Sequence, residues 1–386
     1  MTGRAPSFAA QLAELESQGL LRTRRVVASA PATRIEVDGV PRTAFCSNDY
    51  LGLAQHPALI DAATTALREF GVGGTASHLI SGHHASHARL EERLQAYLGR
   101  PCLVFSSGYA ANTGALPALA DAGDVLFCDA LIHASLIDGA RLSRARVERF
   151  AHNDMADLRL RLGSVSARRK LIVVDGVYSM DGDLAPLPDL LELAEHHDAW
   201  LYVDDAHAFG VLGAGGRGTP AHFGLDSSRI IQLCTFGKAA GVAGAALCAE
   251  AEVVAWLVQR ARSYVYSTAM PPALAAALDA SLSLFADEDG RQRLAANIER
   301  FRKGCDSLPW TLLPSVTPIQ PLVIGDVVRV MAIAQALWEQ GIWVPAIRPP
   351  TVPAGSARLR VSLSAAHTND DVDLLIRALR RCAREC

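Results

Sequence analysis

The sequence predicts an α/β fold in which a mainly parallel sheet forms a large domain and a smaller α+β domain follows it. From Cys102 onward, short and continuously apolar runs alternate with segments of helical periodicity. This is the pattern of parallel strands that are buried on both faces and joined by helices. After about residue 290 the pattern changes to a charged helix, isolated strands and two further helices. The 386 residues, half of them apolar, are enough for a large domain and a satellite.

The elements expected before Cys102 are short. Apolar residues at helical spacing predict one helix that ends in a basic cluster, and a turn at Asp38-Gly39 separates two short strands. A loop at 71–82, rich in Gly and Ser, separates two longer helices. In order, we expect a helix at 7–22, strands at 34–37 and 42–45, and helices at 57–70 and 85–98.

The regular region and the C-terminal region supply the remaining elements. Strands of the large sheet are expected at 102–105, 125–128, 147–150, 171–174, 200–203, 230–235 and 243–248, with helices at 109–120, 134–144, 154–162, 187–197 and 250–262. The C-terminal region should contain helices at 291–308 and 327–340, strands at 321–324 and 358–363, and a last helix from Asn369. We therefore divide the chain into an N-terminal helix with short strands (1–50), a large α/β domain (51–289) and a C-terminal α+β domain (290–386).

The composition excludes several classes of protein. A formal net charge of −3 offers no basic surface, so no nucleic-acid partner is expected. The eight cysteines are scattered, without a Cys-x-x-Cys pair, and several lie in apolar runs, which favours free buried thiols in a reducing compartment over a disulfide framework. The N-terminus has no apolar leader, and no uncharged stretch is long enough to span a membrane. We expect a cytoplasmic protein with no membrane contact.

Two apparent motifs do not meet their structural requirements. Gly-x-Gly-x-x-Gly occurs at 213–218, but dinucleotide binding needs a helix directly after it, and Thr219-Pro220 interrupts there, so we expect a glycine-rich loop. His83 and His87 share a helix face without the Glu of His-Glu-x-x-His, so we expect a helix-start or surface histidine group and no metal. The chain has neither Gly-x-Ser-x-Gly nor the P-loop pattern, which removes the simplest hydrolase and NTPase hypotheses.

Polar residues follow two neighbouring apolar runs at the points where we expect strands to end. Asp204 and His207 come after the run at 200–203, and Lys238, one of only three lysines, follows Thr235. The carboxyl ends of neighbouring strands in an open α/β sheet are where ligands bind. The sequence therefore predicts a site that combines an acid, a histidine and a lysine.

Two further features belong to the same edge of the predicted sheet. Gly108-Tyr109 follows the first strand at the start of a helix, where free N–H groups can hold a phosphate, and His133 precedes the next helix. An anion site, a strand-end Asp and a lone Lys together indicate pyridoxal-phosphate chemistry, in which the lysine binds the aldehyde and the acid keeps the pyridine nitrogen protonated. Taken singly, each has a structural explanation, with Asp204 as a helix cap and Lys238 as a solvated charge.

Three motifs carry a resemblance to a known family. The segments 47–52 (Ser-Asn-Asp-Tyr-Leu-Gly), 203–207 (Val-Asp-Asp-Ala-His) and 235–238 (Thr-Phe-Gly-Lys) resemble the α-oxoamine synthases, pyridoxal-phosphate enzymes of fold type I, and the resemblance covers nearly the whole chain. Within that family, the segments 346–355, 357–360, 366–367 and 175–183 resemble the members of biotin synthesis that condense L-alanine with a pimeloyl thioester. Asp175 departs from the family, whose members usually have Glu there, so contacts at that position must shift.

The resemblance implies a role for each candidate residue. Lys238 would bind the cofactor and later remove the substrate Cα proton, Asp204 would pair with the pyridine nitrogen, and His133 would stack on the ring. The catalytic set is Lys238, His133, Asp204 and His207. The implied cofactor contacts also include Gly108, Tyr109, Ser179, His207, Thr235 and Thr268, and the implied substrate contacts are Arg22, Asn48, His133, Thr351 and Arg360.

The resemblance also implies a homodimer with the site at the interface, where Thr268 reaches the partner's phosphate. It leaves open whether coenzyme A or an acyl carrier protein delivers the acyl group. Sister reactions on the same scaffold are alternatives: glycine with acetyl-CoA, glycine with succinyl-CoA, or serine with palmitoyl-CoA. A catalytically inactive relative and a binding module for another phosphorylated ligand are alternatives of other classes.

Overall fold

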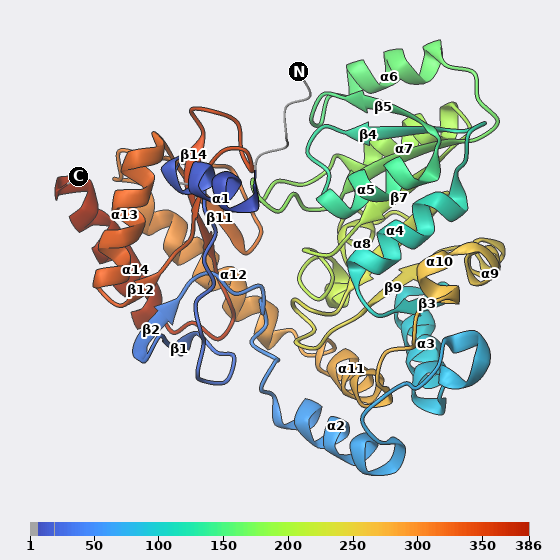
Figure 1. The fold of residues 1–386 in the computed structure, drawn as a ribbon, viewed down its shortest axis with the longest axis horizontal. Helices are drawn as coiled ribbons and strands as arrows, with labels where there is room; N and C mark the ends of the chain where they lie inside the picture. Colours follow the sequence, from blue (N-terminus) through green and yellow to red (C-terminus); the bar gives the residue numbers. More distant parts are fainter. Residues whose placement is uncertain (1–6, 19, 386) are drawn as a thin grey trace.

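The computed structural model describes residues 7–18 and 20–385 and has two lobes (Figure 1). One lobe is built around a seven-stranded sheet, and the other combines the C-terminal elements with the first two strands. Residues 1–6, on which part of the leader prediction depends, lie outside the described residues, as do residue 19 of the expected first helix and Cys386. None of the described helices is long and apolar enough to cross a membrane.

The large sheet has the strand order β3-β9-β8-β7-β6-β4-β5. All neighbours pair in parallel except β9, which is antiparallel to both β3 and β8. The strands are β3 (Cys102–Phe105), β4 (Val125–Asp129), β5 (Arg146–Phe150), β6 (Lys170–Asp175), β7 (Ala199–Asp204), β8 (Ile230–Thr235) and β9 (Ala245–Cys248). The prediction of a mainly parallel sheet is confirmed, and each expected strand is present.

Helices cover both faces of this sheet, which explains why its strands are continuously apolar. In β7, Tyr202 packs in a core with Leu116 of α4, whereas Leu201 and Val203 pack in the opposite core with Leu190 of α7. The helices of this lobe are α2 (Pro57–Phe70), α3 (Ala85–Leu98), α4 (Gly108–Leu119), α5 (Ala134–Ser143), α6 (Met155–Ser164), α7 (Leu187–His196), α8 (Thr219–His222), α9 (Ala251–Arg260), α10 (Arg262–Val265) and α11 (Pro272–Leu284), with a π-turn at His78–Gly82 and a 3₁₀ turn at Ala214–Gly216.

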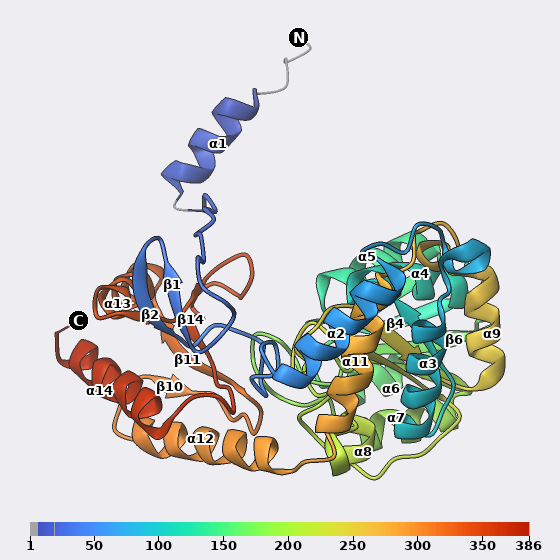
Figure 2. The ribbon, with the colours of Figure 1, turned by 90° about the horizontal axis from the view of Figure 1, so that it is seen from below.

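The smaller lobe contains two small sheets, with strand orders β10-β11-β14-β13 and β1-β2-β12. Its elements are β1 (Arg34–Val37), β2 (Val40–Ala44), α12 (Asp289–Cys305), β10 (Thr311–Leu312), β11 (Ile319–Gly325), α13 (Val327–Glu339), β12 (Ile342–Trp343), β13 (Ala346–Ile347), β14 (Ala357–Ser362) and α14 (Asn369–Glu385). Because β12 pairs in parallel with β2, the N-terminal strands join the C-terminal lobe. Helix α1 (Phe8–Ser17) projects away from both lobes and buries none of its residues (Figure 2). The domain limits remain a prediction.

The glycine-rich loop differs from expectation in one detail. A helical turn, α8, does open at Thr219, because a proline in the first turn of a helix needs no N–H partner. The loop glycines serve packing: a Cβ on Gly218 would lie 1.8 Å from Oδ2 of Asp205, and one on Gly216 would lie 2.9 Å from the Gly210 backbone. The loop therefore leaves no open cradle at these two glycines.

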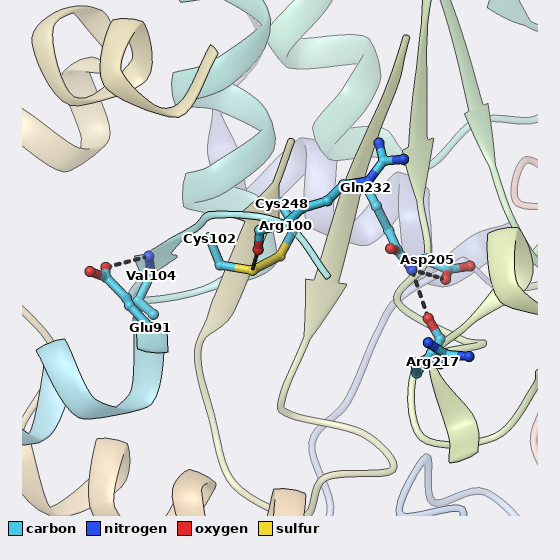
Figure 3. Close-up of a disulfide and its surroundings, with 8 residues drawn as sticks. All are labelled: Glu91, Arg100, Cys102, Val104, Asp205, Arg217, Gln232 and Cys248. Carbon is cyan, nitrogen blue, oxygen red and sulfur yellow. Dashed lines mark hydrogen bonds between the residues drawn. A yellow bond between two sulfur atoms is a disulfide. The ribbon is translucent and has the colours of Figure 1, made fainter. Parts of the chain in front are cut away.

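The expectation of free buried thiols in place of disulfides is wrong for one pair of cysteines. The antiparallel register of β3 and β9 places Cys102 opposite Cys248, with Cα atoms 4.2 Å apart, and the two form a disulfide (Figure 3). They are 146 residues apart in the sequence, so only the pairing of the strands brings them together. Cys128 and Cys234 remain buried free thiols, as predicted.

Candidate active site

A cavity of about 360 Å³ lies at the carboxyl ends of β6, β7 and β8 and beside the turn after β3. Most of the predicted site residues line it: Asn48, Gly108, Tyr109, His133, Asp204, His207, Thr235 and Lys238. Residues that the sequence spreads over nearly two hundred positions therefore meet at one edge of the sheet, where α/β proteins bind ligands.

Lys238 follows β8 and faces this cavity. Burial lowers the pKa of its amine to about 8, and the nearby charge of Arg360 acts in the same direction, while Asp204 and Asp175 oppose the shift. A lysine becomes a nucleophile or a base only as the neutral amine. With a pKa of about 8, about a tenth of Lys238 is the neutral, reactive amine at pH 7, far more than for an ordinary lysine.

Asp204 ends β7 and is held by a chain of hydrogen bonds. Nδ2 of Asn112 donates to Oδ2 of Asp204 at 2.7 Å, and the N–H of Ala206 donates to Oδ1 at 3.1 Å. The hydroxyl of Tyr202 in turn donates to Oδ1 of Asn112 at 2.8 Å. Sequence reasoning missed Asn112, although it stands one helical turn after Gly108 and therefore on the same face of α4. The chain of bonds keeps the Asp204 carboxylate as an acceptor at the cavity.

Asp175 stands beside Asp204, because the two residues pair in register at the ends of β6 and β7. Burial and the charge of Asp204 raise the pKa of Asp175 well above its usual range. Its Oδ1 accepts the N–H of His133 at 3.1 Å. The departure to Asp at this position therefore still leaves a side chain that anchors the backbone at the start of α5.

Two histidines border the cavity in their neutral form. Desolvation lowers the pKa of His133, whose Nδ1 lies 2.7 Å from Oγ of Ser135. Burial lowers the pKa of His207 well below its usual range, and Nδ1 of its ring lies 2.7 Å from the hydroxyl of Tyr50. The Tyr50 hydroxyl also donates to Oδ1 of Asn48 at 3.1 Å. Tyr50 belongs to a quoted motif, but the sequence alone did not assign it a role.

The turn after β3 leads into the N-terminus of α4, which borders the cavity. Ser107 caps α4 by accepting the N–H of Ala110 at 3.1 Å, and the first N–H groups of a helix have no partner within the helix. A Cβ on Gly108 would lie 2.6 Å from Cγ2 of Thr235, so only glycine fits without displacing that side chain. Tyr109 is half-exposed and bonds through its hydroxyl to Asp138.

Arg360 reaches the site from β14 of the smaller lobe. Its Nε donates to the carbonyl oxygen of Ser179 at 2.6 Å, and its Nη1 donates to Oγ of Ser362 at 2.8 Å. Oδ1 of Asn48, which lines the cavity, lies 3.5 Å from the same Nη1. The guanidinium is thus held at the side of the cavity, and Ser179 contributes its carbonyl to holding it.

The remaining predicted residues lie elsewhere. Arg22 and Thr351 line a second hollow of about 580 Å³ with Leu12, Leu15 and the 346–350 segment. Thr268 forms an isolated β-bridge with Ser77 and is not among the residues that line either hollow.

The histidines at 83–87 serve the start of α3. Nδ1 of His87 accepts the N–H of His84, and Nε2 of His87 lies 2.9 Å from the carbonyl of Met270, so both ring nitrogens of this buried residue are engaged. His78 and His83 contact each other through their Nδ1 atoms at 3.0 Å. The helix-start interpretation agrees with these contacts.

The large sheet, with a lysine, a strand-end aspartate and a helix N-terminus around one cavity, defines a pyridoxal-phosphate enzyme of fold type I. The family model described as aminotransferase class I and II matches residues 41–379. A relative from Aromatoleum aromaticum, 8-amino-7-oxononanoate synthase, is 56% identical over 374 residues, which cover 96% of this chain and 97% of the relative.

Solved structures agree with this class. A serine palmitoyltransferase variant from S. paucimobilis with a bound PLP–myriocin aldimine superposes with a TM-score of 0.92, at 29% identity over 98% of this chain and 96% of that one. An 8-amino-7-oxononanoate synthase from Francisella tularensis superposes with a TM-score of 0.77, at 30% identity over 89% and 97%. The chain therefore belongs to the aminotransferase class I and II family and, within it, to the 8-amino-7-oxononanoate synthases. It is an acyltransferase that uses pyridoxal phosphate, which confirms the family resemblance and the cofactor predicted from the sequence.

Proposed function

We propose that this enzyme condenses L-alanine with a pimeloyl thioester to give 8-amino-7-oxononanoate, carbon dioxide and the free carrier thiol in biotin biosynthesis. The observation that best supports the proposal is that Lys238 and Asp204 line one cavity, while Arg360 of the smaller lobe contacts Asn48, which lines the same cavity. The names of the relatives agree with this reaction.

The residues around the cavity fit the cofactor. The N-terminus of α4, with Gly108 closed against Thr235, would hold the phosphate. Asp204 would accept a hydrogen bond from the protonated pyridine nitrogen, His133 would lie against the ring, and Lys238 would bind the aldehyde carbon. When bound, the cofactor supplies an electron sink for negative charge at the amino-acid Cα.

The side chains of the chain itself would then position the substrate and move its proton. Arg360 offers a guanidinium fork that matches a carboxylate, and its existing bonds to Ser179 and Ser362 set its orientation. Nζ of Lys238, with its pKa lowered to about 8, would accept the Cα proton and return a proton after the carbon–carbon bond has formed. Asp204, held by Asn112, would keep the pyridine nitrogen protonated, so that the ring can take up the negative charge that develops at Cα.

The second hollow is our candidate for the acyl chain. Leu12, Leu15 and Leu20 give it an apolar wall, and Arg22 and Thr351 add polar groups. An apolar wall with two cationic residues, Arg22 and Arg348, suits a chain that ends in a carboxylate. Either coenzyme A or an acyl carrier protein could deliver such a chain.

We further propose a cytoplasmic homodimer with the site at its interface. Val72, Ile80 and Tyr266 are each at least 73% exposed, although they flank the loop that pairs Ser77 with Thr268. Large exposed side chains grouped in this way are typical of an association surface. In such a dimer Thr268 would approach the partner's phosphate.

A substrate panel tests the reaction. L-Alanine, glycine and L-serine would each be offered with pimeloyl, acetyl, succinyl and palmitoyl thioesters, and carrier thiol release would be measured. We expect the highest kcat/KM for L-alanine with the pimeloyl thioester. A preference for serine with palmitoyl thioester, the reaction suggested by the name of a structural neighbour, would replace this proposal with a sister reaction.

A further inference from the structure

A tight turn formed by residues 177–184 lies where the two lobes meet. Val177 and Leu184 form a β-bridge at its base, the N–H of Tyr178 donates to the carbonyl of Asp183 at 3.0 Å, and the N–H of Gly182 donates to the carbonyl of Tyr178 at 2.8 Å. We call this segment the 177–184 turn. It follows Asp175 at the end of β6, so it begins at the cavity.

Residues of the smaller lobe form hydrogen bonds to one side of the 177–184 turn. Nε of Arg360 donates to the carbonyl of Ser179 at 2.6 Å, and the Ser315 and Thr317 hydroxyls donate to the carbonyl of Gly182 at 2.8 and 3.1 Å. Arg358 forms an ion pair with Asp181. The orientation of the Arg360 guanidinium therefore depends on where the turn lies.

In the large lobe, His152 holds the other side of the 177–184 turn. Its Nε2 lies 2.8 Å from Oδ2 of Asp183, and its Nδ1 lies 3.0 Å from Oδ1 of Asp129. Nδ2 of Asn153 adds bonds to Oδ2 of Asp183 at 3.0 Å and to the Leu184 carbonyl at 3.2 Å. Burial alone would lower the pKa of His152, but its hydrogen bonds to the two carboxylates outweigh burial and raise the pKa to about 10. At neutral pH the ring is charged, and both of its nitrogens donate.

Asp129, at the end of β4, connects the hydrogen bonds of His152 to the turn before His133. Its carboxylate is fully buried and accepts the N–H of Leu131 at 2.8 Å and the N–H of Asn153 at 2.9 Å. It thereby shapes the turn that leads into His133. One imidazolium is thus joined, through Asp129, to the backbone that carries His133 and, through Asp183, to the turn that holds Arg360.

We propose that His152 is a positioning residue for the amino-acid half-site, which it sets by fixing the 177–184 turn against the turn that precedes His133. This inference rests on the proposed function, because it takes Arg360 as the carboxylate-binding group. The charged ring lies between two carboxylates and donates one bond to each, so each ring nitrogen fixes one turn. A shift of about 1 Å in a positioning group can cost about a hundredfold in rate.

Two neutral variants separate the two contacts. The side-chain amide of Asn lies about where Nδ1 of His152 lies, so His152→Asn keeps a donor for Asp129. The longer Gln places its amide about where Nε2 lies, so His152→Gln keeps a donor for Asp183. We expect His152→Asn to raise the KM for L-alanine about tenfold or more, in the range of one lost charged hydrogen bond, and to leave the KM for the thioester within about twofold. His152→Gln should give a smaller rise. His196→Asn, at an exposed position at the end of α7, is the control and should match the parent.

A second measurement does not depend on turnover. Amide hydrogen exchange in cofactor-free protein should be faster for Tyr178 and Gly182 in His152→Asn than in the parent, and unchanged in His196→Asn. Asp183→Asn should reproduce the effect, and in the double variant His152→Asn/Asp183→Asn the two effects should not add.

Several results would overturn the inference: an unchanged KM for L-alanine, an equal rise for both substrates, additive effects, or unchanged exchange in the turn. A parent enzyme that does not accept L-alanine would instead refute the proposed function. In that case, amide exchange in the 177–184 turn would still decide whether His152 anchors the turn. If His152→Asn does not fold, the same measurements on Asp183→Asn decide the question.

Discussion

Gly108 offers the sharpest test of the anion cradle. The residue begins α4 in a helical conformation, so alanine suits its backbone and would by itself favour the helix by about 1 kcal/mol. The added Cβ, however, would lie 2.6 Å from Cγ2 of Thr235, whereas carbon atoms in contact are about 3.5–4.0 Å apart. The overlap of roughly 1 Å must be relieved by moving Thr235 or by opening the turn, at a cost of about 1–3 kcal/mol.

Moving Thr235 or opening the turn should weaken cofactor binding more than it lowers the stability of the fold. We expect Gly108→Ala to raise the apparent Kd for pyridoxal phosphate about tenfold to a hundredfold, the equivalent of that strain, as measured by titrating the cofactor-free protein. Thr235→Ser removes the clashing methyl, and the next atom, Cβ of Thr235, is 3.8 Å away, so the double variant should regain most of the affinity.

Gly163→Ala is the matched control, because this second helical glycine has no atom closer than 4.0 Å to its added Cβ. Parent-like affinity in Gly108→Ala, or a double variant as weak as the single one, would refute the assignment of this turn as the phosphate cradle.

Three further outcomes follow from the site. Lys238→Ala should lose both turnover and the visible absorbance band of the lysine-bound cofactor, whereas Lys303→Ala, at an exposed position, should keep both; a normal band in Lys238→Ala would contradict the assignment. Because the folded-state pKa of Lys238 is lowered to about 8, its neutral fraction grows as pH rises through that value. The rate at which the cofactor-free protein captures pyridoxal phosphate should therefore rise with a midpoint near pH 8, and a midpoint near the ordinary lysine value of about 10.4 would show that the amine is not desolvated. Arg360→Lys keeps the charge but loses the planar fork, so the KM for L-alanine should rise about tenfold with little change for the thioester; equal changes for both substrates would move the carboxylate site elsewhere.

All seven strands of the large sheet could be predicted from the sequence because most of them are buried on both faces. Such strands are continuously apolar, as at 200–203, and they end abruptly where polar residues such as Asp204 meet the ligand edge. Fewer strands of the small lobe could be predicted from the sequence. Strands β10, β12 and β13 have two residues each, too few to show a period. In the large lobe, α11 was missed as well, because it is so uniformly apolar that no periodic face distinguishes it.

Contacts between distant segments could not be predicted in the same way. The disulfide between Cys102 and Cys248 depends on the register of β3 against β9, which spacing does not encode. Asn112 and Tyr50 are ordinary residues in a helix and a loop until the fold sets them beside Asp204 and His207. Residues that only position other residues have no distinctive sequence pattern and could not be predicted. Residues with distinctive chemistry, such as Lys238, could be predicted.

The two carboxyl groups at the ends of β6 and β7 explain why Asp204 is better suited than Asp175 to face a protonated ring nitrogen. Both are buried at the same edge of the sheet and in register, so their charges repel each other. Asp175 accepts one backbone N–H and has a raised pKa, so it retains a proton more readily than an ordinary Asp. Asp204 accepts a hydrogen bond on each of its oxygens, one from Nδ2 of Asn112 and one from the N–H of Ala206. Asp175 therefore anchors the backbone of His133, and Asp204, held by a side-chain and a backbone donor, is our candidate partner for the ring nitrogen.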